Sequence, residues 1–156
     1  MYRMLLLIAL LASPSIYGQT GAHLFETGFA WHGVNSSGIE GQVGYGKEMG
    51  VGPGTGHYGA LLGAEWQPSS NMVGWSGQLF YSFTINGKGV NLRPSYVLYQ
   101  RGGLNLPVIR PEAGFSYNIF SVNYGYNLWL NDPVVSVPYH RLILRVQMPF
   151  GVGGSS

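Results

Sequence analysis

The sequence contains no cysteine and very few charged residues. Asp, Glu, Lys and Arg make up 9% of its 156 residues, against about 25% in ordinary soluble domains. The lack of cysteine excludes disulfides and thiolate metal sites. A net charge of +2, with no basic run interleaved with aromatic residues, excludes the usual footprint of nucleic-acid binding. No apolar stretch reaches the roughly 18 residues of a transmembrane helix, so no such helix is expected.

Glycine and aromatic residues, by contrast, are plentiful. There are 25 glycines, and Phe, Trp and Tyr make up 14% of the chain, with 11 tyrosines. A soluble domain covers its surface with charge, so this composition favours a β-protein that meets lipid. The length suits one domain and is short for two.

The N-terminal segment has the pattern of a secretory signal peptide. Arg3 gives a positive n-region and residues 4–12 form an apolar h-region that is too short to span a bilayer. Small or polar residues follow, and cleavage is expected after Gly18. We therefore expect residues 1–18 to be a cleaved signal peptide and residues 19–156 to form the mature domain outside the cytoplasm.

After Thr20, eight segments alternate bulky apolar residues with small or polar ones, at the two-residue period of a β-strand. The fourth segment alternates most cleanly, and only Phe80 places a bulky side chain on its polar face. The segments match the 9–11 residues of a tilted transmembrane strand. The bulky faces comprise Phe25, Phe29 and Trp31; Ile39, Val43 and Tyr45; Tyr58, Leu62 and Trp66; Val73, Trp75, Leu79, Tyr81 and Phe83; Val90, Leu92, Tyr96 and Leu98; Ile109, Ala113, Phe115 and Tyr117; Phe120, Val122, Tyr124, Tyr126 and Leu128; and Leu142, Leu144, Val146, Met148 and Phe150.

Two-residue hairpin turns separate several of these segments. Asn86-Gly87 and Gly102-Gly103 suit type I′ turns, in which both central residues need a positive φ. Across a two-residue turn the numbers of facing residues sum to an odd number, so the bulky face must switch between odd and even positions. It switches at both dipeptides, and again at Asn118-Ile119, although isoleucine is a poor turn residue. Turn chemistry and alternation therefore predict the same strands.

The charged residues lie on the face opposite the bulky one, and two charges in one segment always share a face. A soluble carrier barrel would turn the bulky face inward around an apolar ligand, whereas a membrane barrel turns it outward to lipid. The polar faces are rich in Gly, Ser and Asn, and aromatic residues gather near strand ends, as at an interfacial girdle. Both features favour the membrane barrel. The charged face comprises Glu26, Glu40, Glu65, Arg93, Arg101, Arg110, Glu112, Arg141 and Arg145.

We therefore expect an all-β fold, an eight-stranded antiparallel up-and-down transmembrane β-barrel with short loops. An open edge in hydrocarbon would leave costly unpaired backbone groups, so the first and last strands must pair. Eight strands leave a lumen that side chains just fill, and charges buried there must pair with one another. The predicted interior ion-pair network comprises Glu26, Glu40, Glu65, Arg93, Arg110, Glu112, Arg141 and Arg145.

Two details of the fifth and sixth segments can also be predicted. The turn at Gly102-Gly103 places Arg93 opposite Glu112, so we expect an ion pair between these two side chains. Pro94 and Pro111 interrupt the same two segments. Because proline removes a ladder donor, we expect a local bulge there.

Three parts of the chain carry a family resemblance: Gly18-Gln19 at the signal end, residues 122–127 (VNYGYN), and the closing segment from His140 to Phe150. Together with the strand pattern they resemble small outer-membrane barrels of the OmpA/OmpX type and the short barrels common in Bacteroidetes. The architecture covers nearly all of the mature chain, but the motifs are weak and the family shares no catalytic residues. The resemblance implies a place in the cell outer membrane, with lipid and other envelope proteins as partners. With the N-terminus inside, the outer connections would lie near residues 33–36, 67–72, 102–103 and 131–138.

No motif assigns a reaction to the chain. The glycine-rich segment 54–59 matches a nucleotide-binding pattern, but no helix follows it, so no nucleotide is expected. The four histidines lack metal-ligand spacing, so no metal site, cofactor or catalytic residue is predicted. The histidines are His23, His32, His57 and His140.

Three functions remain open at this point. The first, which a filled lumen favours, is a non-enzymatic structural or interaction protein of the outer membrane. The second is an outer-membrane enzyme that modifies lipid, for which His140 and Ser136 are the candidates to test. The third is a secreted soluble barrel that carries an apolar ligand.

Overall fold

The computed structural model describes residues 21–31, 37–51, 53–131 and 139–152, and the predicted signal peptide lies outside these ranges. Within them, no helix is long and apolar enough to cross a membrane. The elements are β1 (Gly21–Trp31), β2 (Ser37–Val51), β3 (Gly54–Gln67), the 3-10 helix η1 (Pro68–Ser70), β4 (Met72–Ile85), β5 (Lys88–Leu92), β6 (Ser95–Arg101), β7 (Leu104–Arg110), β8 (Glu112–Tyr117), β9 (Phe120–Tyr126), β10 (Leu128–Trp129) and β11 (His140–Val152).

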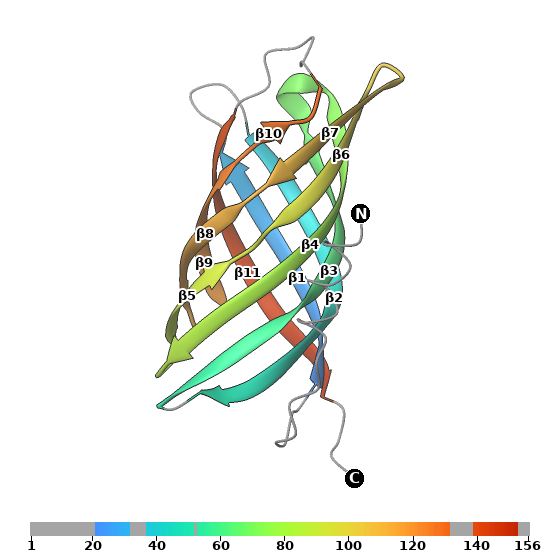
Figure 1. Ribbon diagram of the computed structural model, residues 1–156. Coiled ribbons are helices and arrows are strands. Elements are labelled where there is room, and N and C mark those ends of the chain that lie inside the picture. The colour runs from blue at the N-terminus through green and yellow to red at the C-terminus, as the bar shows by residue number, and fades with distance from the viewer. Residues whose placement is uncertain (1–20, 32–36, 52, 132–138, 153–156) are drawn as a thin grey trace, which may run out of the picture.

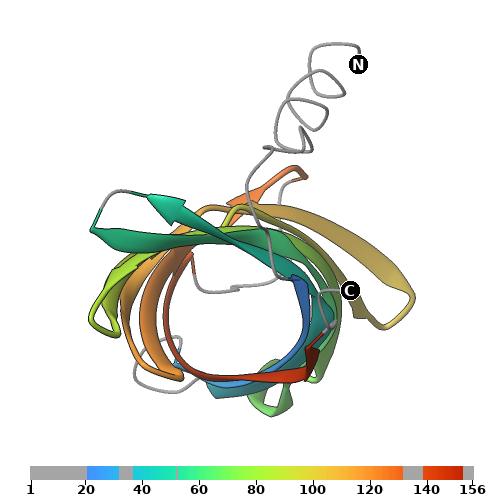
Figure 2. The same ribbon diagram turned by 90° about the horizontal axis from the view of Figure 1, so that it is seen from below.

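The strands close into an eight-stranded antiparallel barrel, as predicted (Figure 1). Three barrel strands consist of two elements each. The second element continues the line of the first in the pairs β5 and β6, β7 and β8, and β9 and β10. Each barrel strand pairs with its neighbours in sequence, and β1 pairs with β11 to close the wall. Seen along the axis, the strands form a ring (Figure 2).

The registers between strands fix the tilt of the barrel. Following directly paired residues once around the wall from Gly21 leads back to β1 at Trp31, ten residues further along. With about 3.3 Å per residue and about 4.8 Å between strands, this offset tilts the strands by roughly 40°, within the usual range for barrels. The path runs through Gly21, Lys47, Tyr58, Tyr81, Leu92, Ala113, Tyr124, Leu142 and Trp31.

The bulges predicted at Pro94 and Pro111 are absent from the described wall. The register between neighbouring strands is the same on both sides of each proline. Both proline carbonyls still accept ladder hydrogen bonds, from the N–H of Leu79 at 3.0 Å and of Tyr126 at 3.2 Å. Each proline therefore removes one N–H donor from the hydrogen-bond ladder and leaves the other bonds in place. The prediction of a bulge was wrong.

Two-residue turns connect three pairs of strands at the predicted positions. Both residues of Asn86-Gly87 (φ 50° and 74°) and of Gly102-Gly103 (φ 53° and 82°) have a positive φ, as a type I′ turn requires. At the third turn only Asn118 has a positive φ, of 52°. Ile119 therefore keeps the ordinary backbone of a β-branched residue, which explains why the turn tolerates it.

Most bulky side chains face outward, and the side chains of the predicted ion-pair network face the axis. On the outer wall, apolar and aromatic residues are exposed, up to 71% for Leu62 and 73% for Phe115. The eight residues of the predicted network are each no more than 4% exposed. The orientation inferred from alternation is therefore confirmed, and Phe80, the bulky residue expected on the polar face of the fourth segment, points into the lumen with 5% exposure.

The two ends of the barrel differ in what they carry. The turn end holds the turns Asn86-Gly87 and Asn118-Ile119, and there β1 starts and β11 finishes. The loop end holds η1 and the turn Gly102-Gly103 (Figure 1). These are two of the four connections predicted to share one end. The other two, near residues 33–36 and 131–138, fall almost entirely outside the described residues.

Candidate functional site

The lumen contains an evenly balanced set of buried ions, the four glutamates and four arginines that the sequence pattern placed on one face. They come from six of the eight barrel strands. Ions taken out of water are tolerated only when opposite charges lie close and satisfy one another. In this lumen they join into one continuous chain of ion pairs that runs from the turn end towards the loop end.

The chain begins at Arg93, the arginine nearest the turn end. Arg93 Nη1 donates hydrogen bonds to Glu26 Oε1 at 2.5 Å and to Gln78 Oε1 at 3.3 Å. The same Glu26 oxygen lies 3.4 Å from Arg145 Nε. Glu26 belongs to the first barrel strand and Arg93 to the fifth, so this pair spans the lumen between opposite walls.

Arg145 is the centre of the ion chain and is fully buried. Its Nε donates a hydrogen bond to Glu40 Oε1. Its Nη1 lies 2.6 Å from Glu112 Oε2 as an ion pair that lacks hydrogen-bond geometry. Gly28 makes room for this group, because a Cβ there would lie 2.9 Å from both Arg145 Cγ and Glu40 Oε1. Three carboxylates, including that of Glu26, thus surround one guanidinium.

Glu65 forms a second centre closer to the loop end. Its Oε2 accepts hydrogen bonds from Arg110 Nη1 at 2.8 Å and from Arg141 Nη1 at 2.7 Å. Arg141 Nη2 in turn donates to Glu40 Oε2 at 2.8 Å. Arg141 therefore links the two centres, and positive and negative charges alternate along the whole chain.

Neutral side chains continue the hydrogen bonding to η1. The hydroxyl of Tyr99 donates to Glu65 Oε1 and accepts from Arg110 Nη2. Gln67 Nε2 donates to the same hydroxyl at 2.9 Å, and Ser70 Oγ lies 3.3 Å from Gln67 Oε1. The polar chain therefore extends from Arg93 to the end of the barrel that carries η1.

The ion pair predicted between Arg93 and Glu112 is not formed. The two residues do face each other, since the N–H of Arg93 donates to the carbonyl of Glu112 at 2.8 Å and the N–H of Glu112 donates back at 3.1 Å. Their side chains bind Glu26 and Arg145 instead. The register was right and the partners were wrong, because long side chains in a narrow lumen reach other walls.

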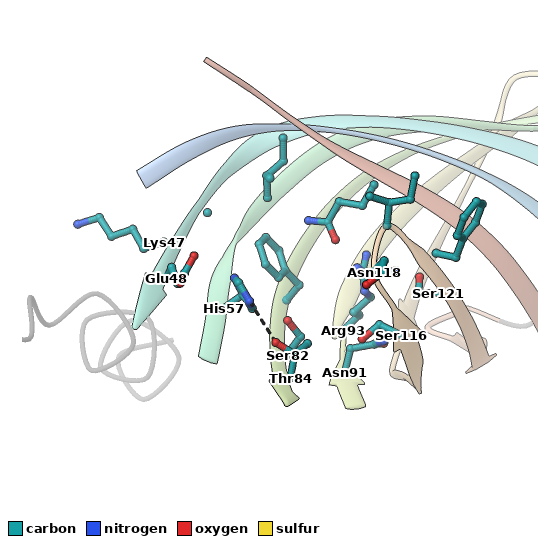
Figure 3. A pocket seen from close by; sticks show the side chains of 16 residues that line it. Lys47, Glu48, His57, Ser82, Thr84, Asn91, Arg93, Ser116, Asn118 and Ser121 are labelled. Atoms are coloured by element: carbon teal, nitrogen blue, oxygen red, sulfur yellow. Dashed lines mark hydrogen bonds between the residues drawn. The ribbon is translucent and has the colours of Figure 1, made fainter. Parts of the chain in front are cut away.

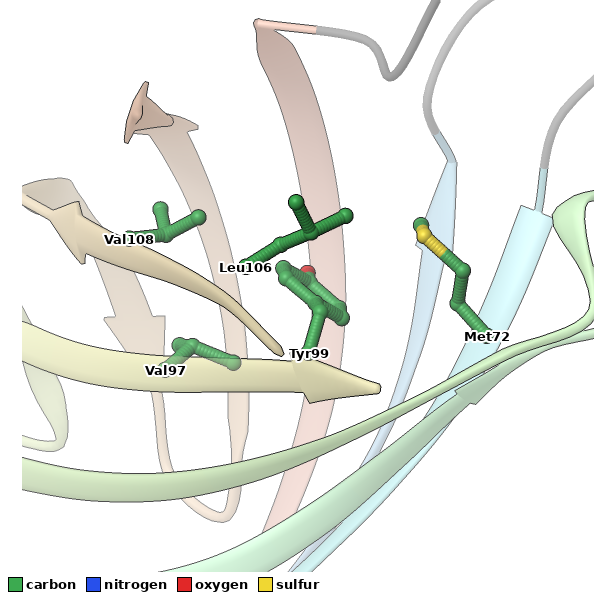
Figure 4. Packing of buried hydrophobic residues seen from close by; sticks show 5 residues of the cluster. All are labelled: Met72, Val97, Tyr99, Leu106 and Val108. Carbon is green, nitrogen blue, oxygen red and sulfur yellow. The ribbon is translucent and has the colours of Figure 1, made fainter. Parts of the chain in front are cut away.

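Bulky apolar side chains gather in the lumen near the loop end, a group that the alternation pattern did not predict. Trp129 packs against them, its ring centroid 5.7 Å from that of Tyr99. Bulky residues occupy both faces of β6 and β7, so alternation could not reveal the group, and the run of residues 96–99 was the one available signal. The cluster comprises Met72, Val97, Tyr99, Leu106 and Val108, each at most 6% exposed (Figure 4).

A cavity of about 400 Å³ lies in the lumen near the turn end (Figure 3). Phe80 forms part of its wall and packs with Leu24 and Leu61. The guanidinium carbon of Arg93 lies 5.8 Å from the centre of the Phe80 ring. Gly46 accommodates that ring, because a Cβ at Gly46 would lie 2.8 Å from Phe80 Cζ. The Phe80 ring on β4 thus fills the space that the absence of a side chain at Gly46 on β2 leaves in the lumen.

His140, a candidate from the sequence for lipid chemistry, is exposed on the outer wall among aromatic rings. Its Nδ1 shares a hydrogen bond with the Tyr124 hydroxyl. Its ring meets that of Tyr126 edge-on, with centroids 5.0 Å apart. The second candidate, Ser136, lies outside the described residues.

His57 and the glycine-rich segment lie at the start of β3. His57 lines the cavity and lies 3.5 Å from the Thr84 hydroxyl (Figure 3). Residues 54–59 form the start of β3. His32 and the side chain of His23 are not among the parts of the chain that the structure describes. Among the described residues, no group of three or more His, Cys, Asp or Glu side chains could hold a metal ion.

No protein-family model matches the chain, and no curated protein matches its sequence. The fold and the lumen alone define its class: a small closed β-barrel with an apolar outer wall and a lumen largely filled by ion pairs.

Proposed function

We propose that the chain is a non-enzymatic β-barrel protein of a bacterial outer membrane, with a structural or interaction role in the cell envelope. The observation that carries this proposal is the exposure of bulky apolar and aromatic side chains around the wall while the network charges are buried. In water this arrangement would expose large apolar patches. In lipid it is the ordinary arrangement of a transmembrane barrel. Closure of β1 on β11 also supports it, because hydrocarbon does not tolerate an open edge.

The lumen argues against a soluble carrier of apolar ligands. Such a carrier needs an apolar interior, and ion pairs from Glu26 to Arg110 occupy the middle of this one. The same packing argues against a diffusion pore. We expect conductance close to background when the purified protein is added to planar bilayers. A stable open channel in most insertions would contradict the filled lumen.

Membrane extraction followed by gel electrophoresis tests the proposal directly. The protein should sediment with membranes, dissolve in detergent, and migrate differently before and after boiling, because a closed barrel keeps its shape in detergent until it is heated. A soluble carrier would instead appear in the periplasm or medium without detergent. Recovery in that soluble fraction, with no change of migration on boiling, would remove the proposal.

Two arginine substitutions sharpen this test. Leu62 lies in the middle of the outer wall, paired with Val43 and Gly77, whereas Tyr117 lies beside the turn at Asn118. The cost of arginine on a lipid-facing wall is about 2–4 kcal/mol at the bilayer centre and about 0–1 kcal/mol near the interface. Leu62→Arg should therefore reduce the folded, heat-modifiable fraction strongly, and Tyr117→Arg should reduce it little.

In water the two substitutions would be equivalent. Both side chains are more than half exposed, at 71% for Leu62 and 57% for Tyr117, so a soluble barrel would accept arginine equally well at either position. Equal behaviour of the two variants, in yield and in unfolding, would count against a membrane environment.

A further inference from the structure

The cavity at the turn end contains buried polar groups that have no partner. Asn91 is 3% exposed, and neither its amide nitrogen nor its amide oxygen makes a hydrogen bond. The Ser116 hydroxyl and Arg93 Nε are also without a partner. A buried polar group left unsatisfied destabilises a fold. Those that line the cavity are available to a ligand that enters it.

These groups belong to a polar band on neighbouring strands. Ser82 of β4 pairs directly with Asn91 of β5, and Ser116 of β8 pairs directly with Ser121 of β9. Asn91 and Ser116 lie on strands that pair with each other, and Figure 3 shows both side chains in the cavity. The band therefore presents hydroxyl and amide groups from four adjacent barrel strands to one space.

Apolar surface and balanced charge complete the cavity. Leu24 and Phe80 supply apolar carbon atoms to its wall. Among the described residues that line the cavity, Arg93 carries the one guanidinium, and Glu26 neutralises it at 2.5 Å. The other charged side chains that line it are Lys47 and Glu48, which have opposite signs. The cavity therefore suits a neutral ligand that combines hydroxyl groups with an apolar face.

We propose that this cavity binds a neutral sugar unit through Asn91 and Ser116. A side-chain amide offers one acceptor and two donors, which match two adjacent hydroxyls of a sugar, while the C–H face of the ring packs against Phe80. The volume of about 400 Å³ lies within the roughly 300–1,000 Å³ of small-molecule pockets. Asn118 and Ile119 of a turn line the cavity, so the sugar enters from the turn end.

Titration of the folded barrel in detergent tests this site. Protein labelled with ¹⁵N is titrated with glucose and with N-acetylglucosamine, and the side-chain amide signals are followed by NMR. The Asn91 signal, identified by its absence from the Asn91→Leu variant, should shift saturably with a Kd in the roughly millimolar range. Asn91→Leu should bind at least about tenfold more weakly, because leucine keeps the size and removes the donor and acceptor. Ser116→Ala should weaken binding by several-fold.

A matched control separates binding from general effects of the substitution. Gln100 lies on the same barrel strand as Asn91 but is exposed and does not line the cavity, so Gln100→Leu should bind sugar like the unmodified protein. Without sugar, Asn91→Leu should unfold at a higher urea concentration than the unmodified protein, because it removes an unsatisfied amide. An asparagine held by the fold itself would lose stability on this change.

The outcomes separate the proposal from its alternatives. Absence of a saturable shift with either sugar, or unchanged binding by Asn91→Leu, would overturn it. Binding of N-acetylalanine methylamide in place of sugar would assign the cavity to a peptide segment, and preferential binding of inorganic phosphate would refute a neutral ligand. None of these results bears on membrane insertion, which the gel and fractionation experiments test separately.

Discussion

The two halves of the lumen differ in how completely side chains fill them. From Arg145 to the loop end, ion pairs and hydrogen bonds link the charged side chains into one chain, and an apolar cluster packs beyond them. At the turn end, a cavity remains and the amide of Asn91 has no partner. A barrel that needed only rigidity would fill both halves alike. We therefore expect the half with the ion chain to contribute more to stability and the half with the cavity to admit a ligand.

The largest effect should follow from breaking the centre of the filled half. Arg145→Met leaves the carboxylates of Glu26, Glu40 and Glu112 around an uncharged side chain, which should cost about 3–5 kcal/mol. Urea unfolding of the refolded protein in detergent measures the loss. Adding Glu112→Gln should recover part of it, because Arg145 is the close ion-pair partner of Glu112 and Arg110 lies 3.9 Å away.

Arg101→Met is the matched control for this change. Arg101 lies beside the turn Gly102-Gly103, is half-buried, and forms no ion pair among the described residues. Its replacement should alter stability by no more than about 0.5 kcal/mol. Equal losses at Arg101 and Arg145 would show that the ion chain does not carry the stability of the filled half.

The next effect concerns the boundary between the halves. Phe80→Ala removes the ring that packs with Leu24 and Leu61, and we expect a loss of about 3 kcal/mol, the lower end for buried phenylalanine because one side already borders the cavity. Unfolding in urea measures it. Phe115→Ala, at a ring 73% exposed on the outer wall, should cost less than about 1 kcal/mol, since detergent contacts replace those of the ring.

Removal of a single hydroxyl in the filled half should have an intermediate effect. The Tyr99 hydroxyl bonds to Glu65, Arg110 and Gln67. Tyr99→Phe should therefore lower the free energy of unfolding by about 2 kcal/mol, because these partners are charged or buried. A change below about 0.5 kcal/mol, the ordinary range for surface substitutions, would mean that the partners are satisfied without it.

The same chemical change in the cavity half should have the smallest effect. Ser116→Ala also removes one buried hydroxyl, but this one has no partner. Stability without ligand should change by no more than about 0.5 kcal/mol, with a small gain the expected direction. If Ser116→Ala costs as much as Tyr99→Phe in the same unfolding assay, buried hydroxyls contribute equally to stability in the two halves.

Much of the architecture could be predicted because side-chain direction in a strand depends only on odd or even position. That rule placed Glu26, Arg93 and Arg145 on the inner face and Leu62 on the outer face, as the structure has them. The turn at Gly102-Gly103 fixed the register that sets Arg93 opposite Glu112. Local chemistry was sufficient wherever one turn determined one pairing.

Ion-pair partners could not be predicted in the same way. The approach of Glu26 to Arg93 across the lumen depends on all the registers between their strands, and several connections lack a turn signal in the sequence. The apolar cluster near Val97 and Leu106 was hidden because both faces of β6 and β7 carry bulky residues. At Pro94 the expectation of a bulge overestimated the cost of one missing donor, since the remaining ladder bonds hold the register.

Closure of the wall has a consequence for the order of its strands. Ala22 of β1 pairs with Val152 of β11, so the first and last strands, at the two extremes of the barrel sequence, are neighbours in the wall. A chain with these extremes joined by a short linker and reopened at Asn86-Gly87 would retain every pairing except that single turn. Such a circular permutant should assemble into the same barrel. Sequence order therefore decides when each strand is synthesised, whereas its position in the ring is set by its neighbours.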